Sequence, residues 1–124
     1  MEVQLVHHYF EYDSIEDALG DETGVVIHST FFKIGSEEHK FLTKITEKIP
    51  EVIQLENEIE IEPFSAEILY QSSNGNSFIV YHGSLTHPPC TESVIWMISD
   101  NVFSATKEQV DLTIYSHSIN TYNL

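Results

Sequence analysis

The sequence predicts a mainly β fold of the α+β class, in which a mixed, mostly antiparallel sheet carries a few short helices. Four stretches rich in β-branched and aromatic residues predict the strands, at residues 2–10, 25–34, 77–81 and 91–99. Glycine, proline and asparagine separate these stretches as turn residues do. No repeat or linker divides the 124 residues, so we treat residues 1–124 as one domain.

The first two strands are predicted from the spacing and type of their residues. Along residues 2–10 the side chains follow the period of two typical of a strand, which puts Gln4 and Val6 on the same face. His7 and His8 are neighbours on this strand, so they point to opposite faces and cannot chelate one metal ion together. Residues 25–34 predict the second strand because β-branched and aromatic residues dominate them.

The predicted helices begin at hydroxyl side chains of the kind that cap helix N-termini. Such caps are expected at Ser14 before a helix at residues 15–19, at Ser36 before a helix that Pro50 ends, and at Thr106 before a final short helix.

Two further segments have a simple structural interpretation. Residues 56–62 alternate glutamate with isoleucine, which fits either a charged edge strand or an acidic loop. Residues 72–76 contain Asn-Gly at their centre and predict a turn between strands.

The charge of the chain excludes several classes of partner. Twenty acidic residues against five basic ones give a formal net charge of −15 at pH 7. Phosphate backbones and anionic lipid surfaces repel such a chain, so we expect no nucleic-acid partner and no membrane partner. No apolar run approaches the ~18 residues of a membrane span, and no signal peptide follows Met1. The sequence therefore leaves the compartment unknown.

Residues 81–96 are the most informative segment of the chain. A strand-like run ends in the Tyr-His-Gly that opens this segment, and a Pro-Pro pair stiffens the loop that follows. This loop holds the polar side chains of Ser84, Thr86 and His87, an arrangement that can direct hydroxyl and amide groups into a pocket.

This segment resembles the Ser-Leu-Thr-x-Pro-Pro-Cys-x-Glu-x-Val-x-Trp signature of the α-class carbonic anhydrases. Residues 2–8 also resemble the family's Glu-Leu-His-Leu-Val-His-Trp strand, and residues 12–35 and 103–110 follow in the family's order. The resemblance covers nearly the whole chain but only the C-terminal half of a family domain. It therefore implies a partial, incomplete carbonic-anhydrase-like fold.

The resemblance also implies that the family's zinc ligands are missing. Two of the three ligand histidines belong to a His-x-His strand that precedes the family segments matched here. The third ligand position is Gln4, whose amide oxygen is a weaker zinc donor than imidazole. We therefore expect no metal ligand and no cofactor in this chain, whereas complete family members bind zinc.

What the resemblance carries over is the surroundings of that zinc site. It implies that Thr86 is the gating threonine, which hydrogen-bonds the zinc hydroxide, and that Glu2 orients the third ligand from behind. It assigns the carbon dioxide pocket to Val6, Ile27, Leu85, His87 and Trp96. Considered without the resemblance, the apolar members of this set are core positions and Thr86 is a turn hydroxyl.

Cys90 is the single cysteine of the chain, so an internal disulfide is excluded. From its type alone it is a small buried hydrophobe. The resemblance offers another interpretation, because secreted family members have a cysteine at this point that pairs with one near the start of the domain. On that interpretation Cys90 is half of a bridge whose partner is missing.

Two functions follow from the resemblance. The family interconverts carbon dioxide and bicarbonate at a zinc hydroxide, and in the first hypothesis this chain is part of such an enzyme and is inactive alone. In the second it is an acatalytic carbonic-anhydrase-related module that binds a protein partner. Gln4 favours the second hypothesis, and the well-kept loop around Thr86 indicates enzymatic ancestry.

Overall fold

A computed structural model describes residues 1–51, 62–70 and 77–120 of the protein. The predicted turn at residues 72–76 and nearly all of the predicted edge strand or loop at residues 56–62 lie outside the described residues.

The chain forms two compact units, each built from segments that are distant in the sequence. One unit contains Glu2–Phe31 and Ser72–Val102, and the other contains Met1, Phe32–Gln71 and Phe103–Leu124.

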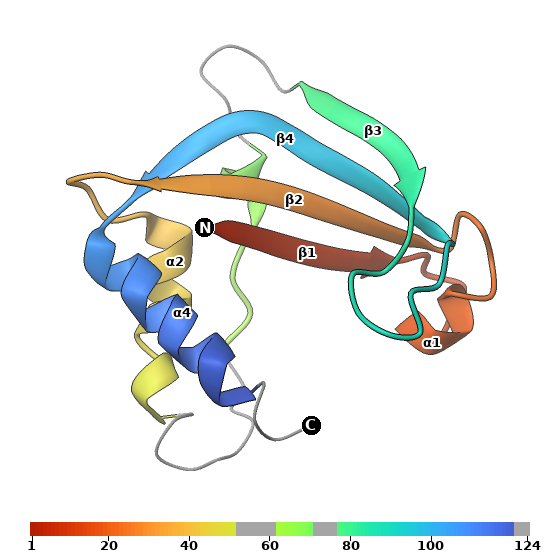
Figure 1. Ribbon diagram of the computed structural model, residues 1–124, viewed down its shortest axis with the longest axis horizontal. Coiled ribbons are helices and arrows are strands. Elements are labelled where there is room, and N and C mark those ends of the chain that lie inside the picture. The colour runs from red at the N-terminus through yellow and green to blue at the C-terminus, as the bar shows by residue number, and fades with distance from the viewer. Residues whose placement is uncertain (52–61, 71–76, 121–124) are drawn as a thin grey trace. The chain divides into compact units, whose positions relative to one another are not determined.

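Most of a four-stranded sheet lies in the first unit, and the sequence predicts this sheet. Its strands are β1 (Glu2–His8), β2 (Val25–Ile34), β3 (Phe78–Gly83) and β4 (Val94–Ala105). Their order across the sheet is β1-β2-β4-β3, which Figure 1 shows from red β1 to green β3. The outer pairs β1/β2 and β3/β4 are antiparallel, while the arrows of β2 and β4 point the same way. The sheet is therefore mixed and mostly antiparallel.

The register of β1 on β2 decides which side chains share a face of the sheet. Gln4 is paired with Ser29, and Val6 is paired with Ile27. Because directly paired residues point to the same side, these four side chains share one face. The alternation predicted for the first strand is therefore present, although the strand ends at His8 rather than at residue 10.

Helix α1 (Ile15–Ala18) follows β1 and contacts it. The predicted N-cap at Ser14 is confirmed, because its hydroxyl accepts a hydrogen bond from the backbone N–H of Asp17 at 3.1 Å. The Asp17 carboxylate accepts from the same hydroxyl at 2.8 Å rather than from the Ser14 backbone N–H that a full capping box would use. Ala18 is fully buried in the core of this unit. That core consists of Ala18, Val25, Ile27, Leu85, Val94 and Trp96.

Strand β4 differs from its prediction at both ends. The sequence predicts residues 91–99, but the strand begins at Val94 and continues to Ala105. Aspartate and asparagine at positions 100 and 101 are poor strand formers, which is why the prediction stops before them. Backbone pairing overrides this preference, because the N–H of Asp100 donates to the carbonyl of Ser77 at 3.3 Å.

The second unit contains helix α2 (Lys40–Thr46), the 3-10 turn η1 (Glu67–Leu69) and helix α4 (Lys107–Asn120). The prediction that Ser36 caps α2 is wrong, because the N-cap residue is His39 and the first turn contains no acidic residue. Pro50 does not end α2 either, because the helix already stops at Thr46 and residues 49–51 are helical again. Proline is tolerated there because the first residues of a helix need no N–H donor.

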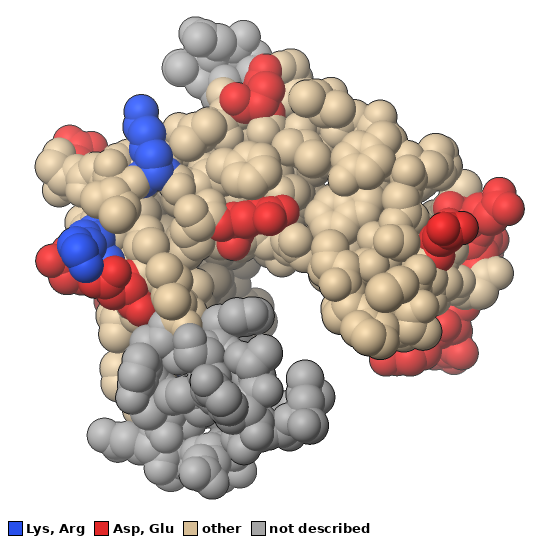
Figure 2. Space-filling view, in the orientation of Figure 1, with Lys and Arg blue, Asp and Glu red and all other residues tan. Residues whose placement is uncertain are grey.

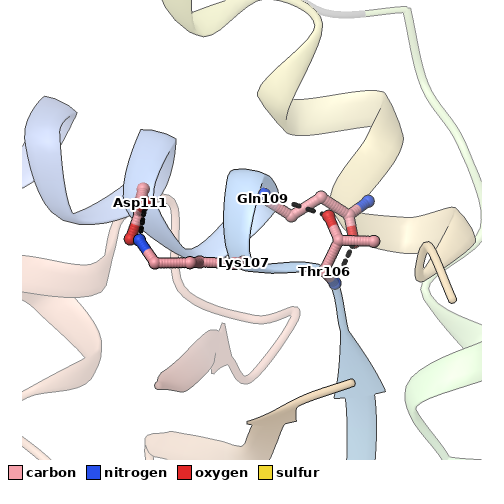
Figure 3. A network of polar contacts seen from close by, with 4 residues as sticks. All are labelled: Thr106, Lys107, Gln109 and Asp111. Carbon is pink, nitrogen blue, oxygen red and sulfur yellow. Dashed lines mark hydrogen bonds and ion pairs between the residues drawn. The ribbon is translucent and has the colours of Figure 1, made fainter. Parts of the chain in front are cut away.

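Helix α4 begins where the sequence predicts but is not short, since it runs for 14 residues. Figure 3 shows its start, where the backbone N–H of Gln109 donates to the hydroxyl of Thr106 at 3.3 Å. The amide oxygen of Gln109 in turn accepts from the backbone N–H of Thr106 at 3.3 Å, which completes a capping box. Lys107 and Asp111 form an ion pair one turn apart on the same helix.

Gln109 also joins α4 to the start of α2. Its side-chain oxygen accepts from the backbone N–H of His39 at 3.0 Å, and its Nε2 donates to the hydroxyl of Thr43 at 3.0 Å. The His39 ring lies between Phe32 and Phe103, at centroid distances of 4.9 and 5.2 Å. One buried amide therefore satisfies backbone groups at the starts of two helices.

Candidate functional site

A cavity of about 700 Å³ opens on the face of the sheet that carries Gln4 and Val6. Both residues line it from β1, and Ile27 lines it from β2. The loop after β3 supplies Leu85, Thr86 and His87 to the same cavity, so these sequence-predicted residues lie together. The sheet therefore provides the floor of the cavity and the Pro-Pro loop provides one wall.

The structure adds lining residues that the sequence analysis did not name. Helix α1 and the residue after it contribute Ile15, Glu16 and Leu19, and the loop contributes Pro88 and Pro89. A capping box predicted the helix but gave no signal of where it would pack. Its position depends on a contact across the fold, since the hydroxyl of Ser93 donates to the carbonyl of Leu19 at 2.7 Å.

The loop that carries Thr86 is closed by its own backbone. The N–H of Leu85 donates to the carbonyl of Thr91 at 3.0 Å, and the N–H of Cys90 donates to the carbonyl of His87 at 2.9 Å. Cys90 has a φ of 58°, a left-handed conformation that few residues other than glycine adopt. These constraints present the Thr86 side chain on a short, fixed turn.

Cys90 itself is an exposed free thiol. The interpretation of Cys90 as a small buried hydrophobe is therefore wrong. Its left-handed backbone at the end of a tight loop keeps the side chain out of the core, where a cysteine would otherwise pack.

Gln4 is held by its neighbour two residues earlier on β1. Its Nε2 donates a hydrogen bond to Oε1 of Glu2 at 3.1 Å, and the same oxygen accepts from the hydroxyl of Ser29 at 2.5 Å. A carboxylate can only accept, so the amide nitrogen of Gln4 must face Glu2. One N–H of the amide is used by this bond, so the oxygen and the second N–H remain for other partners.

His87 also has an assignable tautomer. Its Nδ1 lies 3.1 Å from the carbonyl oxygen of Pro88, which can only accept. The proton of the neutral ring therefore sits on Nδ1, and Nε2 is left as an acceptor.

Two predicted site residues lie outside the lining of the cavity. Trp96 is buried beneath it in the core with Ile27 and Leu85, and its indole N–H donates to the carbonyl of Ser84 at 3.0 Å. Its ring is stacked on Tyr81 at 6.3 Å. Glu2 is not in the cavity lining, but it accepts a hydrogen bond from Gln4, which is.

The segment that leads from α1 back to the sheet is fixed by Asp21. This carboxylate accepts from the backbone N–H of Thr23 at 2.8 Å, from its hydroxyl at 2.9 Å and from the hydroxyl of Tyr12 at 2.9 Å. The Thr23 backbone N–H is the main cause that lowers the pKa of Asp21, and the hydrogen bond to Asp21 raises the pKa of Tyr12. These bonds stabilise the segment after α1, and the first residues of that segment, Leu19 and Gly20, line the cavity.

The charges around the cavity are negative. Glu16 is in its lining, and none of the described lining residues is Lys or Arg. Figure 2 shows acidic side chains recurring over the visible face, while basic ones are few. Among residues 1–51, 62–70 and 77–120, no group of three or more His, Cys, Asp or Glu side chains is arranged to hold a metal ion. No described helix has the length and apolar character needed to cross a bilayer.

Comparison with known proteins identifies the relatives of this chain. The model of the eukaryotic-type carbonic anhydrase family matches residues 1–121. The chain is 31% identical to mitochondrial carbonic anhydrase 5B of Mus musculus and 30% identical to that of Rattus norvegicus. Both matches cover 111 residues, which are 89% of this chain and 34% of the relative. The chain thus spans about a third of the length of these relatives.

Proposed function

The chain belongs to the eukaryotic-type carbonic anhydrase family, and from this premise we propose that it forms the family's pocket without holding the catalytic zinc. On this proposal the chain by itself does not interconvert carbon dioxide and bicarbonate. The family reaction needs a zinc ion that lowers the pKa of its bound water to about 7, and on our proposal no group of this chain takes the place of that ion.

The observation that carries the proposal is the state of Gln4. Its nitrogen is committed to Glu2, so it can offer a metal only a neutral amide oxygen. A histidine at this place would donate one ring N–H to Glu2 and offer the other ring nitrogen as a ligand. The other side chains in the cavity lining that could donate to a metal are Glu16, Thr86, His87 and Thr91. This donor set does not fit a tetrahedral site of three imidazoles and one water.

The remaining pocket residues support descent from a carbon dioxide site. Val6, Ile27 and Leu85 form an apolar surface beside the Thr86 hydroxyl, which suits a small apolar substrate next to a polar reacting group. We assign to Thr86 the gating position and to Glu2 the position behind the third ligand. His87 takes the cavity mouth, and Trp96 supports the apolar wall from beneath.

The test is stopped-flow carbon dioxide hydration by the purified 124-residue chain with added zinc. We expect no zinc-dependent rate above the uncatalysed reaction. Calorimetry should also show that Gln4→His raises zinc affinity, because it adds an imidazole beside Glu2. Glu22→His, at an exposed position outside the lining, is the matched control and should raise it less. A zinc-dependent rate in the unmodified chain that a sulfonamide blocks would refute the proposal.

The alternative is an acatalytic module that binds a protein partner. It is favoured by the exposed apolar side chains of β3, where Ile79, Val80 and Tyr81 are 62%, 59% and 44% exposed. If the chain is instead part of a complete enzyme, carbon dioxide and bicarbonate are the substrates of that enzyme. Val80→Lys separates these roles, because it should weaken partner binding through β3 and leave the ligand affinity of the cavity unchanged.

A further inference from the structure

We propose that the cavity binds a small cation with an apolar body and several N–H donors, such as an aryl amidinium, in preference to an anion. This inference rests on the proposed function, because a zinc ion in the cavity would reverse the preference.

The first support is the orientation of the Gln4 carboxamide. Because its Nε2 points at Glu2, its oxygen is directed away from that carboxylate. Ser29 donates to the same Glu2 oxygen, which anchors the pair to β2. The floor of the cavity therefore offers a fixed hydrogen-bond acceptor at this position. A ligand N–H can use that acceptor, whereas a carboxylate or other anion would be repelled by it.

The wall of the cavity has the same character. With the His87 proton on Nδ1 toward Pro88, the Nε2 of the neutral ring is a second acceptor. The Thr86 hydroxyl can rotate to accept or to donate. The second N–H of Gln4 is an obligatory donor, but the acceptors on Gln4, His87 and Glu16 outnumber it. A ligand rich in N–H groups therefore satisfies these side chains better than one rich in oxygens.

The electrostatic field favours the same ligand. Glu16 lines the cavity, Glu2 lies directly behind Gln4, and the described lining contains no Lys or Arg to offset them. The formal net charge of −15 adds a long-range attraction for cations. A cation that enters would therefore gain from a specific carboxylate as well as from the general field.

The apolar lining decides the body of the ligand. Val6, Ile15, Leu19, Ile27 and Leu85 form aliphatic surface around the polar groups. The volume of about 700 Å³ lies within the range of about 300–1,000 Å³ found for small-molecule sites. An aromatic ring that bears an amidinium group matches both the surface and the acceptors.

Three probes with one ring and different charge test the inference: benzamidinium, benzamide and benzoate. Each is titrated into the full chain with a chelator present, so that no adventitious metal contributes. Binding is followed by amide NMR shifts of the lining residues and by the fluorescence of Trp96, the single tryptophan, which lies under the cavity. We expect affinity to fall from benzamidinium to benzamide to benzoate, with at least about a tenfold difference between the first and last.

Glu16→Gln gives the sharpest variant, and Glu22→Gln is its matched control because it removes the same charge from an exposed position outside the lining. Glu16→Gln should weaken benzamidinium about two- to fivefold, as expected of one exposed ion pair, and leave benzamide unchanged. Glu22→Gln should leave both unchanged. Gln4→Leu keeps the size of the side chain but removes the acceptor, so it should weaken both N–H probes.

Benzoate binding as tightly as benzamidinium would overturn the inference, and so would equal effects of Glu16→Gln and Glu22→Gln on benzamidinium. Saturable probe binding without shifts at the lining residues would overturn it as well. These outcomes are distinct from failure of the proposed function, which appears as zinc-dependent carbon dioxide hydration in the absence of chelator.

Discussion

The hydroxyl of Ser29, which is fully buried, donates its hydrogen bond to Oε1 of Glu2 at 2.5 Å. Glu2→Ala leaves this buried donor without its acceptor, so we expect the free energy of unfolding to fall by about 1–3 kcal/mol. Glu22→Ala is the control and should change it by less than about 0.5 kcal/mol. Urea unfolding of each variant measures the difference.

A double-mutant cycle tests the cause of that loss. Adding Ser29→Ala to Glu2→Ala removes the stranded hydroxyl, so the double variant should be more stable than the sum of the single effects predicts. Strict additivity would show that the Ser29–Glu2 bond is not what Glu2 contributes.

Gly24 is required where the chain passes close to Ala18, the last residue of α1. A Cβ at this position would lie 2.8 Å from the carbonyl carbon of Ala18 and closer still to its oxygen. Because the Cβ would meet backbone atoms, Gly24→Ala should destabilise the fold by about 2 kcal/mol or more. The amide NMR shifts that benzamidinium causes at the cavity-lining residues should also be lost. Gly20→Ala is the matched control, since its Cβ would come no nearer than 3.3 Å to the carbonyl oxygen of Asp17. Equal melting temperatures for the two variants would contradict this account.

The stability of the protein should fall in mildly acidic solution. Burial lowers the pKa of His28 and His39 from the ordinary value of 6.5, and the charge of His7 lowers that of His28 further. As the pH falls below 6.5, these histidines become protonated in the unfolded chain but stay neutral in the folded chain, because their folded pKa values are lower. Stability is therefore complete above 6.5 and is lost below it until the folded pKa values are passed, by at most about 1.4 kcal/mol per pH unit for each histidine.

His39→Phe separates this effect from other titrations. The phenyl ring retains contacts with Phe32 and Phe103 but cannot be protonated, so the slope of stability against pH below 6.5 should become shallower. Thermal unfolding of His39→Phe and of the unmodified chain between pH 5 and pH 8 measures the two slopes. An unchanged slope in His39→Phe would assign the pH dependence elsewhere.

Strand β3 should mediate self-association of the isolated chain. It forms one edge of the described sheet, and Ile79 and Val80 are more than half exposed on it. An apolar edge strand without charged residues readily pairs with another strand. Sedimentation should show concentration-dependent association that Val80→Lys weakens. Val102→Lys, at a valine that is 54% exposed on β4, is the control and should weaken it less. A monodisperse, cooperatively melting monomer at all concentrations would refute the prediction.

The sequence by itself determined the elements whose signal is local. The second strand was predicted with its observed bounds, Val25–Ile34, because β-branched and aromatic residues fill it. The caps at Ser14 and Thr106 marked two helix starts, because a cap depends on residues three positions apart. The period of two placed Gln4 and Val6 on one face, which is the face of the cavity.

Only the tertiary structure decided what depends on residues far apart in the chain. The continuation of β4 through Asp100 requires pairing with Ser77, and the place of α1 in the cavity wall requires the bond from Ser93 to Leu19. The orientation of the Gln4 amide likewise follows from a carboxylate that Ser29 anchors across the sheet. For residues other than proline, local propensity is worth at most about 1 kcal/mol per residue, so backbone pairing and buried hydrogen bonds outweigh it wherever the fold brings such partners together.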